Sequence, residues 1–195
     1  MSDYYTPCIV RETSEGTTRI PIQDELYQRR EIQLTGDIDA ESVNSVILQL
    51  RYLQAQDPER EIVVYINSPG GSVPDGLALV DVMGALSCPI KTVCLGTAAS
   101  MAALVFASGN ERHITEHSRV MVHDPLLAGG VGGPALKVDA LAKDLMYTRE
   151  VTAKILAERT GHTLEEVFEK TVQDTYFSAE EALEWGLADK IIHEI

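Results

Sequence analysis

The stretch that decides the fold is "EIVVYINSPGGSVPDGLALVDVMGALSCPIKTVCLGTAASMAALVFASG", residues 61–109. It begins with an apolar run without clean alternation (61–67), which is typical of a strand covered on both faces. A Ser-Pro-Gly-Gly turn leads into a helical pattern, in which Pro74 suits the first helical position. A second apolar strand (90–96) then leads into an alanine-rich helix that contains Ser100. Strand–helix pairs at this spacing predict an α/β fold with a largely parallel sheet.

The flanking segments extend this pattern in both directions. Upstream of residue 61, an irregular N-terminal segment precedes "REIQLTGDID", which predicts a strand ending at Gly36. Asp39 can then cap a helix that stops before Pro58. Downstream of residue 109, residues 112–115 and 118–123 read as two further strands. No repeat, linker or low-complexity tract divides the chain, so we expect one domain over residues 1–195.

A long helix is predicted between Gly132 and Gly161, with apolar positions recurring over about 26 residues, more than twice the usual length of roughly 11–12. A helix of this length in a small domain is expected to bury surface elsewhere, for instance against another subunit. A capping box at Thr163 begins a second helix, a third runs from Ser178 to Gly186, and the chain closes as a strand.

Composition limits the partners of the chain. Sixteen Lys and Arg against 30 Asp and Glu give 195 residues a net charge of −14, which argues against nucleic acid or an anionic membrane as the main partner. Three unrelated cysteines and the absence of a signal peptide favour a reducing compartment, and we expect a cytoplasmic protein. No P-loop or metal-ligand spacing occurs, so neither a cofactor nor a metal is expected.

Ser100 is the first candidate for chemistry, because a lone hydroxyl stands between a strand and an alanine-rich helix. Free N–H groups at a helix N-terminus would stabilise a neighbouring oxyanion. "GTAASMA" is not the Gly-x-Ser-x-Gly pattern, however, and a serine at a helix start more often bonds locally. Gly70 and Gly71 can bring backbone close to a reacting group, so that the Gly71 N–H meets a negative oxygen, or they can simply form a tight turn.

His123 and Asp174 are candidate partners of this serine. His123 ends a strand, where parallel sheets place their sites, and a neutral imidazole there could take a proton from a serine. Asp174 could hold the other ring nitrogen, shielded from water by Tyr176 and Phe177, although it could equally form a local turn. Among the other histidines, His117 and His162 lie in polar, turn-like surroundings and are expected to be solvated.

Four blocks resemble the proteolytic subunit of the Clp protease family, in order and at similar spacing: "YINSPGGSV", "GTAASMAAL", "SRVMVHDPL" and "YFSAEEALEWGLADKI". The resemblance implies a crotonase-like spiral of βαβ units. It also implies an N-terminal axial segment (1–20), a head (21–122 and 161–195) and a handle (123–160). Two stacked seven-membered rings would enclose a chamber in which unfolded polypeptides, delivered by a separate AAA+ unfoldase, are cleaved.

The resemblance also assigns roles within the chain. It implies Ser100 as nucleophile, His123 as general base and Asp174 as orienting acid. The backbone N–H groups of Gly71 and Met101 would form the oxyanion hole. The substrate would be bound by four residues: Gly70, Val73, Pro125 and Leu126.

The chain departs from the family pattern beside two of these residues. Asp124 follows the histidine where the family usually has Gln, and a second carboxylate there could bind the base. Val172 and Gln173 stand where the family commonly carries an acidic residue and an Arg that pair across the rings. These departures leave open a non-catalytic or conditionally active subunit of a mixed ring with a paralogous chain. An acyl-CoA hydratase or isomerase on the same fold is a third reading, because such folds share the paired N–H groups.

Overall fold

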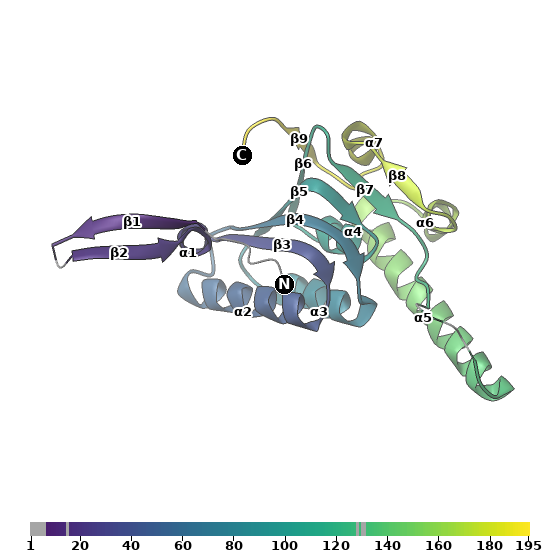
Figure 1. The fold of residues 1–195 in the computed structure, drawn as a ribbon. Helices are drawn as coiled ribbons and strands as arrows, with labels where there is room; N and C mark the ends of the chain where they lie inside the picture. Colours follow the sequence, from purple (N-terminus) through teal and green to yellow (C-terminus); the bar gives the residue numbers. More distant parts are fainter. Residues whose placement is uncertain (1–6, 15, 128, 130–131) are drawn as a thin grey trace.

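The computed structural model describes residues 7–14, 16–127, 129 and 132–195. Its centre is a sheet of parallel strands in the order β3 (Glu31–Ile38), β4 (Ile62–Gly71), β5 (Ile90–Ala99), β6 (Glu111–Thr115) and β9 (Lys190–Ile192) (Figure 1). The predicted α/β architecture with a largely parallel sheet is therefore confirmed.

Strand β5 divides the sheet into two branches. Its first half pairs with β6, whereas its last residues pair with β7 (Arg119–Val122) in parallel. Gly96 lies between the two halves with φ +88°, a conformation that glycine adopts at little cost. Strand β8 (Thr175–Phe177) then pairs with β7 in antiparallel register. The branch β5–β7–β8 carries all three residues of the predicted catalytic set at its ends.

Three helices cover the sheet or fill its core. Helices α2 (Ala40–Gln56) and α3 (Val73–Ala85) lie side by side beneath it in Figure 1. Helix α4 (Met101–Ala107) is buried along its whole length, because its small and apolar residues pack against β4 and β5. As predicted, Asp39 caps α2, which ends at Gln56 before Pro58.

The long helix is confirmed as α5 (Ala135–Thr160), whose 26 residues end at Gly161 in the left-handed conformation. It projects from the body of the molecule (Figure 1). Only Thr152, Ala153 and Leu156 of this helix are buried, all near its C-terminal end. Leu136 and Tyr147 are 84% and 68% exposed, so the helix has the unburied apolar surface that its length predicts.

The capping box at Thr163 begins α6 (Leu164–Thr171), as predicted. The third predicted helix is α7 (Ala179–Glu184), which begins at a capping box formed by Ser178 and ends at Glu184, before Gly186. No helix among the described residues combines the length and the apolar character that a membrane span requires.

The N-terminal segment is more ordered than predicted. β1 (Cys8–Thr13) and β2 (Gly16–Pro21) form an antiparallel hairpin, followed by α1 (Ile22–Gln28). The hairpin projects away from the sheet (Figure 1). Residues 1–6 and 15 of the expected axial segment, and residues 128, 130 and 131 of the expected handle, lie outside the described residues.

Two expectations about β4 were wrong. The Ser-Pro-Gly-Gly segment is not a turn, because β4 continues through it and pairs Gly70 with Asp37 and Gly71 with Ile38. The strand also alternates: Ile62, Val64 and Ile66 are buried, while the residues between them are partly exposed. One face of β4 packs on the core, and the other is only partly covered.

Candidate active site

Ser100 lies at the junction of β5 and α4 in a strained backbone conformation. Its φ of +55° is one that few residues other than glycine adopt. The Ser100 N–H donates to the Met121 carbonyl over 2.8 Å, which anchors this turn to β7. The serine side chain forms no capping bond to its own helix. The local-capping alternative is therefore not what the structure shows.

His123 follows β7 and faces Ser100. Its Nε2 lies 2.8 Å from the Ser100 Oγ, which is hydrogen-bonding distance. Pairing of Ala99 with Met121 places the ends of β5 and β7 together, and so brings the two residues into contact. With the ring proton on Nδ1, Nε2 can accept the serine proton.

The two glycines at the end of β4 are closely packed, Gly70 against Ser100 and Gly71 against Ile38 of β3. A Cβ on Gly70 would lie 2.7 Å from the Ser100 Cβ and 2.6 Å from the Ala99 carbonyl oxygen. Gly71 is equally confined, since a Cβ there would come within 2.2 Å of the Ile38 carbonyl oxygen. Met101 begins α4, so its N–H has no acceptor within the helix. Gly70 therefore brings backbone close to Ser100, whereas the role of the Gly71 N–H stays a prediction.

Asp174 is not in contact with the histidine. It is exposed, and among the described residues it makes no hydrogen bond to His123. Tyr176 is itself 51% exposed, so the expected shielding by this residue is absent in the single chain. The register nevertheless brings the two residues near each other: Val122 pairs with Thr175 in antiparallel strands, and the next positions are His123 and Asp174.

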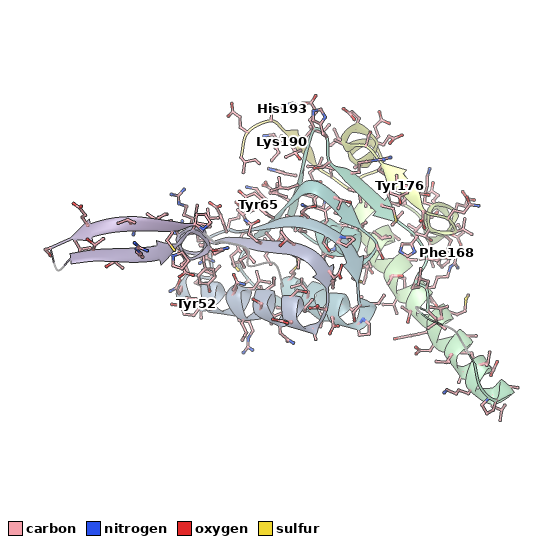
Figure 2. All side chains as sticks on the ribbon, viewed as in Figure 1. Tyr52, Tyr65, Phe168, Tyr176, Lys190 and His193 are labelled. Carbon is pink, nitrogen blue, oxygen red and sulfur yellow. The ribbon has the colours of Figure 1, made fainter. Side chains whose placement is uncertain are left out.

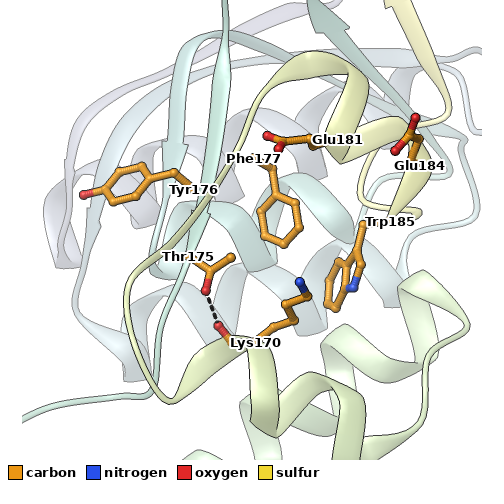
Figure 3. A pocket seen from close by; sticks show the side chains of 7 residues that line it. All are labelled: Lys170, Thr175, Tyr176, Phe177, Glu181, Glu184 and Trp185. Atoms are coloured by element: carbon orange, nitrogen blue, oxygen red, sulfur yellow. Dashed lines mark hydrogen bonds between the residues drawn. The ribbon is translucent and has the colours of Figure 1, made fainter.

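The turn that carries Asp174 is closed by its neighbours. Figure 3 shows the hydrogen bond from the Thr175 hydroxyl to the Lys170 carbonyl, which is 2.6 Å long and spans the segment between α6 and β8. Phe177 and Trp185 line the pocket beside this turn, and their ring centroids are 5.2 Å apart. The turn is thus anchored at both ends, with the Asp174 side chain left in solvent.

The position of Asp124 beside His123 suggested that its carboxylate could bind the base, but the structure gives it other partners. Its Oδ2 accepts from the Arg149 Nε over 2.6 Å, and its Oδ1 accepts from the Thr171 hydroxyl over 2.6 Å. Both carboxylate oxygens are therefore used by α5 and α6. Sequence reasoning missed this pairing, because nothing in the spacing of the three residues indicates contact.

A small cavity opens beside the serine and the histidine. Two of the predicted substrate residues, Val73 and Pro125, line it, and Gly70 lies against Ser100. Leu126 is 66% exposed and is not part of this lining. Sequence reasoning missed Leu104 and Thr152, which complete the wall. The inward face of the long helix was the only signal for Thr152.

The other histidines and the buried thiol lie outside this site. His162 stacks on Trp185 with ring centroids 4.5 Å apart, so it is less solvated than predicted. His113 and His193 each face a glutamate at 3.3–3.4 Å. Cys94 is fully buried, and burial raises the pKa of its thiol to about 12. A thiol with this pKa is not a nucleophile at neutral pH.

Comparison with known families identifies the family of this chain. The model of the Clp protease family matches residues 14–195, and the chain belongs to that family. The crotonase-like α/β fold of the family is the architecture described above. The chain is accordingly a peptidase subunit of the serine hydrolase class.

Proposed function

We propose that this protein is a self-compartmentalised serine endopeptidase in which Ser100 is the nucleophile, His123 the general base and Asp174 the orienting acid. The observation that carries the proposal is the 2.8 Å contact between the His123 Nε2 and the Ser100 Oγ. A hydroxyl is inert at neutral pH without such a base. The cavity beside the pair leaves room for the carbonyl that would be attacked.

The reaction follows from this arrangement. The Ser100 Oγ attacks the carbonyl carbon of the scissile bond as His123 accepts the hydroxyl proton. The resulting oxyanion would be held by the N–H groups of Gly71 and Met101. His123 then protonates the departing amine, leaving an acyl-serine ester. Water hydrolyses the ester by the reverse transfers, which frees the carboxylic acid and restores the hydroxyl.

Assembly and substrate delivery are the finer parts of the proposal. Apolar side chains along α5 are exposed in the single chain, which supports packing of this helix against a second ring. We infer two stacked rings of seven subunits, with unfolded polypeptide supplied by a separate ATP-driven unfoldase. These 195 residues contain no P-loop, which is compatible with an unfoldase that is a separate protein.

Labelling with a fluorophosphonate tests the chemistry. The expected result is a single covalent adduct on Ser100 in the native, assembled protein, and none in Ser100→Ala. A fluorogenic peptide assayed on the same sized fractions should be cleaved only by the unsubstituted protein. An unmodified Ser100 under these conditions would refute the proposed nucleophile.

Conditional activity is the second candidate, and the position of Asp174 favours it. The nucleophile and base are in contact, whereas the acid is exposed and lies outside hydrogen-bonding reach of His123. A subunit in this state would need a shift of the β8 turn, supplied by assembly or by a paralogous partner. Full peptide turnover by dissociated subunits would contradict this candidate. The acyl-CoA hydratase reading loses support, since the chain belongs to a peptidase family.

A further inference from the structure

The residue after the proposed base is held from two helices at once. Besides its two carboxylate contacts, Asp124 donates its backbone N–H to the Thr171 carbonyl over 2.6 Å. Thr171 is the last residue of α6, and Arg149 lies in the middle of α5. Three hydrogen bonds therefore fix residue 124 to elements that do not belong to the sheet.

Arg149 is itself fixed on a second side. Its guanidinium lies over the Phe168 ring, 3.9 Å from the centroid, while its Nε donates to Asp124. Figure 2 labels Phe168 where α6 approaches α5. Because a planar guanidinium stacks and donates at the same time, lysine could not reproduce both contacts. The side chains of Arg149 and Asp124 are only 22% and 29% exposed, so water screens this ion pair less than one on the open surface.

The same contacts reach the turn of the proposed acid. Thr171 is 3% exposed, and its hydroxyl has Asp124 as its acceptor. Asp174 follows three residues later, and Val122 pairs with Thr175 on the far side of it. The bond between Asp124 and Thr171 thus joins the backbone after the base to the backbone before the acid.

We propose that Asp124, Arg149 and Thr171 form a positioning clamp that sets His123 against Ser100 and makes this placement depend on the position of α5. The inference rests on the proposed peptidase function. Asp124 is a positioning residue and not a catalytic one, because its two carboxylate oxygens accept hydrogen bonds from Arg149 and Thr171. The rate of the chemical step is sensitive to the position of the reacting groups, and a displacement of about 1 Å can lower it by about 100-fold.

The test compares Asp124→Asn, Arg149→Met and the double variant with the unsubstituted protein. Asn keeps the size of the side chain and one acceptor for Thr171 but loses the charge. Met keeps an apolar stem over Phe168. Each single variant should slow fluorophosphonate labelling of Ser100 and lower kcat by about tenfold or more, with KM changed less than twofold. The double variant should lose no more than the worse single variant, because both remove one interaction.

A matched control and a rescue separate positioning from folding. Lys154→Met removes a cation from the same helix. Lys154 pairs with Glu150, and both side chains are more than half exposed, so this variant should leave labelling unchanged. Arg149→Lys should recover part of the rate, because it restores a donor without the stacked plane. Thermal unfolding and sedimentation identify any variant that fails to fold, in which case the remaining single variant carries the test.

The outcomes distinguish this inference from the proposed function. Absence of labelling in the unsubstituted protein would refute the function itself. Normal labelling of Ser100 together with kcat and labelling rates within twofold in both single variants would overturn only the clamp. Additive losses in the double variant would also overturn it, because independent effects are not those of a shared contact.

Discussion

Gly70 lies closer to the proposed nucleophile than any side chain would permit. A Cβ at this position would meet the Ser100 Cβ at 2.7 Å, and its φ of +97° is unfavourable for alanine. The backbone of β4 therefore reaches the site only because residue 70 has no side chain. Ser100, on the other side of this contact, also has a strained backbone with positive φ.

We expect Gly70→Ala to lower the free energy of unfolding by about 2 kcal/mol and to slow labelling of Ser100 at least tenfold. Chemical denaturation and labelling kinetics measure the two effects. Gly84→Ala is the matched control, because Gly84 is an exposed residue of α3 with nothing within 4 Å of its Cβ position. Alanine favours helix there by roughly 0.5–1 kcal/mol, so this variant should be more stable. Unchanged labelling in Gly70→Ala would contradict the close approach.

The ion pair of Asp189 makes stability depend on pH. Hydrogen bonds from the Arg112 side chain are the main reason that the pKa of Asp189 lies below its ordinary value, although burial acts in the opposite direction. A carboxylate with a lowered folded-state pKa contributes stability above its unfolded pKa of about 3.9, and this stability is lost as the pH falls through the folded value. The Asp189 side chain is 42% exposed, so solvent reduces the size of the effect.

Asp189→Asn should therefore lower the free energy of unfolding at pH 7 by about 1 kcal/mol. The difference from the unsubstituted protein should shrink below pH of about 4, as the native carboxylate takes up its proton. Urea titrations between pH 2 and pH 7 measure this difference. A constant difference across that range would show that the Arg112 contact does not depend on the charge of Asp189.

At the scale of elements, two glycines with different surroundings lie at the C-terminal end of α5. Gly161 caps the helix with φ +79°, and nothing lies within 4 Å of its Cβ position. Gly186, after α7, has φ +74°, but its Cβ would lie 2.8 Å from the Thr160 carbonyl oxygen. The two positions share a backbone conformation and differ only in packing.

Alanine should consequently cost more at the second position than at the first. We expect Gly161→Ala to lower the free energy of unfolding by about 1 kcal/mol, the cost of the left-handed backbone alone. Gly186→Ala should cost about 2–3 kcal/mol, because the backbone of α5 has to move as well. Equal losses in thermal unfolding would show that α7 and α5 are not in this contact.

Elements with strong local signals could be predicted from the sequence. The capped helices α2, α6 and α7 and the long α5 follow from cap residues and apolar spacing, which act within a few positions of the chain. The hairpin β1–β2 was missed, because most of its residues are exposed and show no core-facing alternation. β8 has only three residues, and its pairing with β7 is a contact between distant segments.

The site also contains residues whose contacts could be predicted from the sequence and residues whose contacts could not. Ser100 and His123 stand at strand ends, where the topology of a parallel sheet brings side chains together, and they do meet. Asp174 is exposed and makes no hydrogen bond to His123, and no local pattern of the sequence encodes the rotamer of such a side chain. The Asp124–Arg149 contact was equally hidden, since 25 residues separate the partners.

For the whole molecule, α5 is the element on which the proposed assembly depends. Met146 and Tyr147 are 59% and 68% exposed near the middle of this helix. Burial of such side chains releases about 25 cal/mol per Å² of apolar surface, which favours a partner surface. The chain also carries a net charge of −14, so repulsion between subunits opposes association at low salt.

Met146→Glu with Tyr147→Glu should therefore separate the proposed pair of rings, because it adds charge to the apolar surface of α5. Sedimentation should show particles of half the mass, with a matching loss of peptidase activity. Raising the salt concentration should favour assembly of the unsubstituted protein, because repulsion between its subunits is screened. Val10→Lys, on the exposed face of the hairpin, should leave the mass unchanged. An unaltered mass for the α5 variant would exclude this helix from the ring contact.

The hydrogen bond from the Ser100 N–H to the Met121 carbonyl has a pharmacological consequence. Separating the backbone of Ser100 from that of Met121 would require β5 to come away from β7, which is a local unfolding of the sheet, whereas the hydroxyl and the imidazole can part by a change of rotamer. An inhibitor that contacts only the backbone around Ser100 would thus meet the same surface in a form with Asp174 in reach of His123 and in a form without that contact. A drug that discriminates between the two forms would have to contact the turn at residues 171–174.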